Sequence, residues 1–518
     1  MNLPHLAPPS LPHASARIPL FAAGVVLVQM AAAERFGIVR DELYHLACAD
    51  HLAWGYVEHP PLSIALLAAW KAVAGEGLLA LRIPGAMLSG ATAILAALLA
   101  REMGGWRLAQ ALAAIAVGLM PGVLALGCFY SMGAVNIAIW LTAALIAARL
   151  LRGGSPRLWL LLGAVIGLGL LNKYSLALLP LSLAIGLLLS PQRRLLRDRW
   201  AWIGAAGATA VVLPNLAWQV GHAWPTLEFL RNARAGLLAG LPAAAFWKDA
   251  VLVMHPLAVP LALLGLAALL WGRRLRAFRP LGVTVVVSAV LVFLSRGNPC
   301  VMVAIWPLAL TAGAVAGEGW ISRHGRAARR FGGGAYALLL LVGGLTLAPV
   351  AIPLVPAKDL LVCQRILGVS PAAEGAGWLD ASACPAPDSI GWRKFAGDVF
   401  AVVTGLSGAD RDSCLLMAGD RGQAGALRYY AAGRGMPPVA SGHNSFHLWG
   451  LPPGGPWRVV VAVGLDEEAL RGIFEQVEFA GRHQGDPDGP IASDLPIYAC
   501  RGWRVAPAEA LGRLKRYI

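Results

Sequence analysis

Charged residues are scarce in this chain. Asp, Glu, Lys and Arg together make up 14% of its 518 residues, whereas a typical soluble domain has about 25%. Hydrophobic residues make up 58%. This composition excludes a disordered chain, a coiled coil and an ordinary soluble enzyme. Because the apolar residues form long runs, the sequence predicts a bundle of membrane-spanning helices.

Several recognisable motifs are also missing. The sequence has no internal repeat, no Walker phosphate loop, no G-x-G-x-x-G fingerprint and no C-x-x-C pair. We therefore predict no cofactor. A divalent ion bridging Glu58 and His59 stays an open alternative, because two ligands do not define a metal site.

Acidic residues are the rarer of the two charge types. The chain has 28 Asp and Glu against 43 Lys and Arg, a net charge of +15. The basic residues gather in short loops between apolar segments, which is the distribution of cytoplasmic loops in membrane proteins rather than that of a nucleic-acid-binding surface. The clusters are Arg101 and Arg107; Arg149, Arg152 and Arg157; Arg193, Arg194, Arg197 and Arg199; Arg273, Arg274, Arg276 and Arg279; and Arg323, Arg326, Arg329 and Arg330.

These loops predict the topology. The first apolar segment, Ile18–Ala33, is interpreted as a retained helix. Pro61–Ala74 is only about 21 Å long as a helix, too short to cross a core of about 30 Å, and is interpreted as interfacial. A span over Leu78–Ala100 follows, and Ala335–Leu354 is the last one. The result is an all-α polytopic bundle of about 11 spans, with the N-terminus inside and the C-terminus outside.

The composition changes near residue 357. Residues 1–356 are predicted to form the membrane domain, with a first outer loop at 34–77, and residues 357–518 a soluble α/β domain on the extracytoplasmic side. Its expected strands are Cys414–Met417, Arg458–Val463 and Ile497–Cys500, and its expected helices Gln423–Tyr430 and Asp466–Phe474. An oxidising compartment would permit disulfides, and buried free thiols are an equal alternative, for Cys363, Cys384, Cys414 and Cys500.

The first outer loop is rich in titratable side chains. Asp41 and Glu42 follow the first membrane helix, and Glu58 and His59 precede the interfacial segment. Acids and histidines at a membrane face are costly to desolvate and mark functional sites. The alternative is a loop whose charges simply face water.

The other outer tips add polar groups. Several of them are cations that the positive-inside rule disfavours on this side. Cations there would hold a lipid-linked phosphate while a carboxylate activates an acceptor. Taken singly, each cation is more typical of an anchor at the membrane interface, and only their convergence favours a binding site. The residues are Arg82, Lys173, Tyr174, His222, Arg231 and Asn298.

Motifs along most of the chain resemble one family. The run "RDELYHLACADHLAWGYVEHPPLSIAL" is similar to the first outer loop of bacterial membrane glycosyltransferases of family 39 type, which are related to protein O-mannosyltransferases and to the aminoarabinose transferase of lipid A. The resemblance continues in "GLGLLNKYSLALL", "LPNLAWQVGHAWPTLEFLRNA" and "GQAGALRYYAAGRGMPPVASGHNSFHLWG". It implies a GT-C fold and the transfer of a hexosyl or pentosyl group from a polyprenyl phosphate, outside the cytoplasmic membrane of a bacterial cell.

The resemblance also implies roles for particular residues. Asp41 matches the acid that acts as general base or orients the acceptor, with Glu42 beside it. Glu58 and His59 match positions near the donor, and Lys173 matches a lysine associated with the lipid phosphate. Where relatives often carry an acid and a lysine, this chain has Asn136 and Asn298.

Two other functions remain alternatives. A flippase or transporter for a lipid-linked sugar would explain the bundle, although the sequence shows no inverted repeat. A non-catalytic membrane protein whose outer domain binds glycan would fit the loss of charge at Asn136 and Asn298. Trp449 and His443 are candidates for such binding, although a buried structural Trp and a turn-forming His-Asn pair are the favoured interpretation of that motif. The expected partners are a polyprenyl-phosphate sugar, membrane lipids and an acceptor that is a lipid, a glycan or a protein, with no nucleic acid.

Overall fold

The chain folds into two units. The computed structural model describes residues 13–235, 242–295, 297–325, 331–352, 354, 389–485 and 494–518. Unit 1 contains the described parts of 1–33, 81–217 and 237–384, and unit 2 contains those of 34–80, 218–236 and 385–518. The predicted domain boundary at residue 356, together with Cys363 and Cys384, lies outside the described residues.

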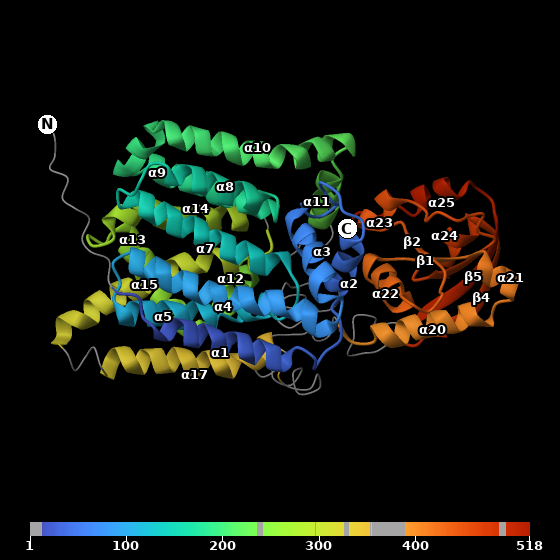
Figure 1. Cartoon of the computed structure of the whole chain (residues 1–518), viewed down its shortest axis with the longest axis horizontal. Helices are drawn as coiled ribbons and strands as arrows, with labels where there is room; N and C mark the ends of the chain where they lie inside the picture. Colours follow the sequence, from blue (N-terminus) through green and yellow to red (C-terminus); the bar gives the residue numbers. More distant parts are fainter. Residues whose placement is uncertain are drawn as a thin grey trace. The chain divides into compact units, whose positions relative to one another are not determined.

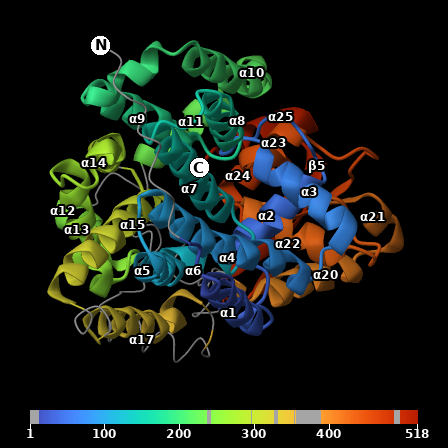
Figure 2. The same cartoon turned by 60° about the vertical axis from the view of Figure 1, so that its left-hand side comes forward.

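Unit 1 is a bundle of helices that run side by side (Figures 1 and 2). Its centre is a continuous apolar core around the fully buried Trp140. The helices are α1 (Arg17–Ala32), α4 (Leu78–Glu102), α5 (Arg107–Gly118), α6 (Pro121–Gly127), α7 (Met132–Leu151), α8 (Leu158–Leu170), α9 (Leu178–Leu188), α10 (Arg199–Gly221), α12 (Ala243–Leu252), α13 (Val259–Leu270), α14 (Arg279–Leu294), α15 (Met302–Ile321) and α17 (Gly333–Ala351).

Buried acids hold the basic ends of these helices together. Glu102, at the end of α4, accepts hydrogen bonds from Arg149 Nε at 3.4 Å and Arg152 Nη1 at 3.1 Å. Glu318, on α15, accepts from the backbone N–H groups of Trp106 at 2.7 Å and Leu108 at 3.2 Å. A carboxylate at this place satisfies amides at the start of α5 that have no partner within the helix.

Further contacts bring the predicted inner loops to one end of unit 1. Arg274 Nη2 donates to the carbonyl of Gly104 at 2.9 Å, and Gln192 Nε2 donates to the carbonyl of Arg276 at 3.5 Å. Elsewhere in unit 1, Asn172 Nδ2 donates to the carbonyl of Met132 at 2.9 Å and joins the segment before Lys173 to the start of α7. The grouping of the basic loops agrees with the Arg distribution of the sequence.

Among the described residues, five helices are long and apolar enough to cross a membrane, or up to eight if each of three bent pairs is one span. The predicted span at Leu78–Ala100 corresponds to α4, which is one of the five. The predicted first and last spans coincide with α1 and α17, which are shorter apolar helices. The total of about 11 spans stays a prediction.

Unit 2 is built on a five-stranded sheet with the strand order β2-β1-β3-β5-β4. Strands β2, β1 and β3 are parallel, whereas β5 runs antiparallel to β3 and to β4. The strands are β1 (Cys414–Ala418), β2 (Val439–Ser441), β3 (Val459–Val463), β4 (Phe474–His483) and β5 (Leu495–Trp503). The helices are α2 (Arg40–Ala49), α3 (Leu62–Ala74), α11 (Pro225–Ala235), α20 (Trp392–Gly405), α21 (Gly408–Asp412), α22 (Arg421–Ala431), α23 (Asn444–Trp449), α24 (Glu467–Arg471) and α25 (Pro507–Arg513).

The observed C-terminal elements extend the predicted ones. The three expected strands are β1, β3 and β5, and the expected helix at Gln423–Tyr430 is α22. Strands β2 and β4 were not predicted, and the expected helix Asp466–Phe474 ends at Arg471, before β4 begins. Cys414 and Cys500 are buried free thiols.

The loop predicted at 34–77 contains α2 as well as the expected interfacial helix, which is α3. Helix α2 packs closely against α22, because Gly422 and Gly425 lack side chains on the shared face. A Cβ atom at Gly425 would lie 2.9 Å from the backbone carbon of Leu43, and one at Gly422 would lie 2.4 Å from Cγ of Arg40. These glycines let α2 approach α22 and so fix where its acidic residues lie.

We expect Gly425→Ala to destabilise the protein by about 1–3 kcal/mol, because the added methyl would push against the α2 backbone. A matched control is Gly397→Ala, within helix α20, where an added Cβ has no neighbour within 4 Å. That change should be neutral or stabilising by up to about 1 kcal/mol. Chemical denaturation of both variants in detergent checks this, and equal stability of the two would contradict the packing argument.

Candidate active site

Two polar residues, Arg421 and Asn444, follow parallel strands of unit 2 and lie at the carboxyl end of the sheet. Strand β1 ends at Ala418 and strand β2 at Ser441, and the carboxyl ends of parallel strands are the usual ligand-binding edge of such sheets. Asp420 caps α22 by accepting from the N–H groups of Gly422 at 2.6 Å and Gln423 at 2.9 Å. Arg421 therefore follows β1, and Asn444 follows β2, at this edge.

Arg421 lies between two carboxylates of the predicted site. Its Nη2 donates to Oδ1 of Asp41 at 3.4 Å, and its Nε is 3.9 Å from Oε1 of Glu58. The guanidinium carbon lies 5.8 Å from the centre of the Tyr44 ring. One cation thus joins an acid of α2 to an acid of the segment between α2 and α3.

Glu58 is held at both oxygens. Tyr44 donates its hydroxyl proton to Oε2 at 2.9 Å, and Nδ2 of Asn444 donates to Oε1 at 3.0 Å. The Tyr44 hydroxyl also accepts from the N–H of Ser445 at 3.2 Å. The Glu58 side chain is only 12% exposed, and the hydrogen bonds to both of its oxygens fix its position.

Asp41 differs from Glu58 in its access to solvent. Its side chain is 48% exposed. Burial by its surroundings would raise the pKa of Asp41, but the charges of Arg421, His45 and Arg40 outweigh this effect and hold the pKa below its ordinary value. Burial likewise would lower the pKa of Arg421, and the charges of Asp41 and Glu58 raise it instead. The pair is therefore ionised, with one open carboxylate.

The segment after α25 adjoins this cluster. The carbonyl oxygen of Ile518 accepts from Nη1 of Arg421 at 3.2 Å and from Nδ2 of Asn444 at 3.1 Å. The N–H of Ile518 donates to Oδ1 of Asn444 at 3.0 Å. Asn444 has a positive φ of 46°, a conformation that asparagine tolerates better than most residues. These bonds fix Asn444 beside Glu58.

Glu42 has a structural place in α2. It is fully buried, and its Oε2 accepts from the N–H of Val39 at 3.0 Å at the start of the helix. Its predicted supporting role in catalysis stays a prediction.

His59 is also buried, and burial lowers its pKa. Its Nδ1 lies 3.1 Å from the carbonyl of Pro60, while its ring lies at 84° to that of His45, with 5.3 Å between centres. Within the described ranges, no group of three or more His, Cys, Asp or Glu side chains is arranged to hold a metal ion.

The other predicted residues lie apart from the Arg421 cluster in sequence and differ in setting. In unit 2, His222 is exposed and stacks on Trp218 at 4.1 Å between ring centres, and Arg231 is exposed on α11. In unit 1, Arg82 is 4% exposed within α4. Lys173 immediately precedes a short 3-10 helix at Tyr174–Ala177.

Two further residues of unit 1 have defined hydrogen bonds. The Tyr174 hydroxyl donates to Oδ1 of Asn215 at 3.2 Å. Asn298 caps the 3-10 helix Pro299–Val301 by accepting from the N–H of Cys300 at 2.8 Å. The structure thus brings Asp41 and Glu58 together through Arg421, and it gives Tyr174 and Asn298 local partners.

Sequence reasoning missed Arg421, Tyr44 and Asn444 as members of the site. Arg421 directly precedes the quoted run that begins at Gly422, and Asn444 lies within that run. A usable signal was the acidic cap Asp420 after a buried strand, because a helix that starts there presents its first residues at the carboxyl edge of the sheet.

Comparisons with known proteins agree with this fold. Residues 58–218 match the model of the dolichyl-phosphate-mannose-protein mannosyltransferase family. The lipid A galacturonosyltransferase RgtD of Rhizobium johnstonii is 29% identical over 189 residues. That alignment covers 35% of this chain, and it spans only 38% of the relative's length.

The structural likeness extends further than the sequence matches. ArnT from Cupriavidus metallidurans bound to undecaprenyl phosphate superposes with a TM-score of 0.57 at 16% identity, covering 94% of this chain and 98% of ArnT. The apo state gives a TM-score of 0.53, covering 93% and 97%. The predicted resemblance to GT-C membrane glycosyltransferases is confirmed. With the apolar helices of unit 1, it makes the chain a multi-pass membrane protein.

The lowered pKa of Asp41 predicts a dependence of stability on pH. An acid whose folded-state pKa is depressed stabilises the fold above its unfolded pKa, here 3.8, and this contribution is lost as the pH falls through the folded-state pKa. The melting temperature of the wild type should therefore exceed that of Asp41→Asn above about pH 5 and should lose that margin at pH values below 3.8.

The same comparison in an Arg421→Gln background provides the control. Without the Arg421 charge the margin at neutral pH should be smaller, because only the charges of His45 and Arg40 then oppose the effect of burial on the pKa of Asp41. A margin that is the same in both backgrounds would show that Arg421 does not stabilise the Asp41 carboxylate.

Proposed function

We propose that this protein transfers a sugar from a polyprenyl-phosphate-linked donor to an acceptor on the outer side of the bacterial inner membrane. The observation that carries this proposal is the ionised, half-open Asp41 carboxylate beside Arg421 and the fixed Glu58, in a chain with the fold of ArnT. The matched ArnT structure holds undecaprenyl phosphate, which supports a donor of that class.

The proposed reaction is a substitution at the anomeric carbon. An acceptor hydroxyl or amine attacks this carbon and forms the new glycosidic bond. The bond from the carbon to the phosphate oxygen breaks, and its electron pair leaves with the polyprenyl phosphate. The proton of the acceptor passes to a carboxylate. Because the leaving group is already an anion, cations that stabilise it reduce the need for an acid.

The two carboxylates of the cluster suit different tasks. Both oxygens of Glu58 accept hydrogen bonds within the protein, so Glu58 is assigned a supporting role. Asp41 is 48% exposed and remains ionised, so it is assigned as the base. Glu42 supports it by stabilising the start of α2, the helix that carries Asp41.

The donor phosphate is assigned to cations from the predicted outer tips. Lys173, with Arg82 or Arg231, is proposed to contact the phosphate. His59, Tyr174, His222 and Asn298 are proposed as further substrate-binding residues. Lys173 supports this assignment, because it lies in a loop of unit 1 that is predicted to be on the outer side, away from the basic loops predicted to be on the inner side.

The topology follows from the same argument. The end of unit 1 that holds the basic loops is proposed to face the cytoplasm, and the domain at 357–518 to be periplasmic. The grouping of Arg149 and Arg152 with Glu102, and of Arg274 with Gly104, supports a single basic end.

Asp41→Asn keeps the shape of the side chain and removes the base. We expect sugar transfer by the purified protein to fall by about 10²-fold or more. The matched control is Asp50→Asn, because Asp50 also joins α2 to α22, through Arg428 at 3.0 Å, and should leave transfer within a few fold of wild type. Similar losses in both variants would remove Asp41 from the chemistry and assign it to helix packing.

Transfer assays with the wild-type protein also separate the alternatives. A flippase for a lipid-linked sugar, or a glycan-binding protein, would form no new glycosidic bond. Absence of any transfer product with extracts of envelope lipids, glycans and proteins would contradict the proposed function.

Lys173→Gln should weaken donor binding about tenfold or more, since a charged hydrogen bond to a phosphate is lost. Lys173→Arg should retain most of the affinity. Arg157→Gln removes a cation that lies over the Trp200 ring at 5.8 Å, in a basic loop, and should not affect the donor. Direct binding of a polyprenyl phosphate checks all three, and unchanged affinity in Lys173→Gln would refute the assignment.

A further inference from the structure

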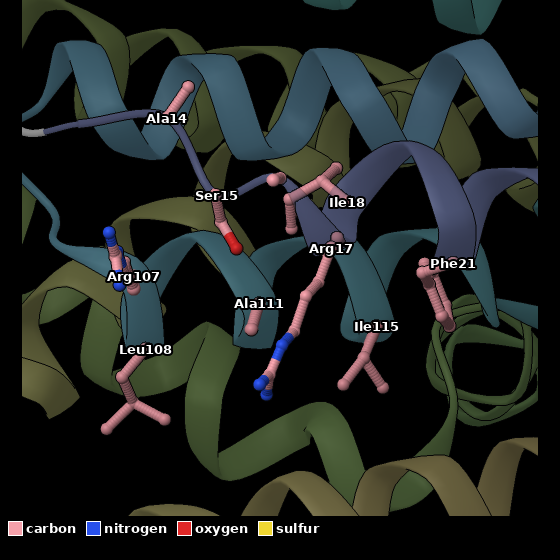
Figure 3. A pocket seen from close by; sticks show the side chains of 11 residues that line it. Ala14, Ser15, Arg17, Ile18, Phe21, Arg107, Leu108, Ala111 and Ile115 are labelled. Carbon is pink, nitrogen blue, oxygen red and sulfur yellow. The ribbon is translucent and has the colours of Figure 1, made fainter.

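A cavity of about 800 Å³ lies between the starts of α1 and α5 in unit 1. It opens at the end of the bundle where the basic loops gather. Figure 3 shows Arg17 extending from the start of α1 and Arg107 from the start of α5, with Ala111 between them in this view. Phe21 and Ile115 line the part further from Arg107.

Hydrogen bonds fix the mouth of this cavity. Gln110 on α5 is 2% exposed. Its Oε1 accepts from the N–H of Ser15 at 3.0 Å, and its Nε2 donates to the carbonyl of His13 at 3.1 Å. The same Nε2 lies 3.2 Å from the carbonyl of Gly105. This buried amide ties the segment that leads into α1 to the start of α5, and these two segments carry Arg17 and Arg107.

A second, apolar pocket lies further along α1. Phe21 lines both spaces. The second pocket, of about 220 Å³, exposes only apolar surface between α1, α6 and α17. From Arg17 to Val28 the two pockets together follow about 16 Å of helix. The remaining lining residues of the second pocket are Gly24, Val25, Leu119, Leu124, Leu341, Leu345 and Ala348.

The charges at the mouth are available to a ligand. Arg17 and Arg107 are both exposed, and within the described part of the chain neither forms a salt bridge. The two acids nearby have other partners. Glu102 pairs with Arg149 and Arg152, and Glu318 accepts hydrogen bonds from backbone amides. A site with two cations at its mouth and an apolar groove behind them complements a molecule that has an anionic head and a hydrocarbon tail.

We propose that this groove binds an anionic phospholipid of the leaflet that faces the basic loops. Its phosphate lies between Arg17 and Arg107, and one acyl chain lies along α1 past Phe21. This site involves none of the residues assigned to the proposed sugar transfer.

The head-group test uses matched pairs of charges. Wild-type protein is reconstituted in nanodiscs with equal phosphatidylglycerol and phosphatidylethanolamine, and the retained lipid is measured by native mass spectrometry. We expect a preference for phosphatidylglycerol that falls by about tenfold or more in Arg17→Gln/Arg107→Gln. Arg193→Gln/Arg194→Gln removes two exposed cations from another basic loop and should keep the preference. No preference in the wild type, or equal loss in both double variants, would overturn the proposal.

The tail test uses glycines with open space beside them. A Cβ at Gly24 has no neighbour within 4 Å, and the same is true of Gly207 within α10. Gly24→Leu should fill the groove and lower phosphatidylglycerol retention severalfold, whereas Gly207→Leu should not. Melting temperatures of all variants separate lost binding from misfolding. If a folded Gly24→Leu variant retains phosphatidylglycerol fully, and inorganic phosphate alone displaces the lipid, the site is a simple anion site and the lipid site is refuted.

Discussion

Two neighbouring carboxylates of unit 2, Asp41 and Glu58, share one cation, Arg421. Asp41 and Glu58 lie within 3.4 Å and 3.9 Å of its guanidinium nitrogens. Without it, a charge that lowers the pKa of Asp41 against the effect of burial would be lost, and two like charges would lie close together with no shared cation. The position of Arg421 in turn depends on the sheet, because α22 begins directly after β1. The stability of the sheet and the charge of the site are therefore linked through one side chain.

Much of the fold follows from local patterns. The apolar run at Leu78–Ala100 and the helix α4 agree to within two residues, because a span needs a continuous apolar stretch. Strands β1 and β3 are buried at every position and appear in the sequence as short apolar runs. By contrast, only the two ends of β4 are buried, so its sequence carries little alternation, and it was missed.

Only part of the candidate site could be predicted from the sequence. Asp41 and Glu58 stood out as acids beside apolar segments, and the structure brings both to Arg421. Arg421 itself is one of many arginines and lies 380 positions from Asp41 in the chain. A contact between residues so far apart in the chain depends on the packing of α2 against α22 at Gly422 and Gly425, which no local sequence pattern reveals. Tyr44 was quoted in a motif, but its bond to Glu58 depends on the same docking.

The carboxylate of Glu318 has a consequence for biosynthesis. It satisfies the amides of Trp106 and Leu108, yet it follows Trp106 by 212 residues. At a translation rate of about 5–20 residues per second, it is made roughly ten to forty seconds after α5. During that interval the start of α5 must rely on water or lipid head groups for its hydrogen bonds. The early helices therefore reach their final hydrogen bonding only after α15 has been inserted, so α5 is completed late in the assembly of the bundle.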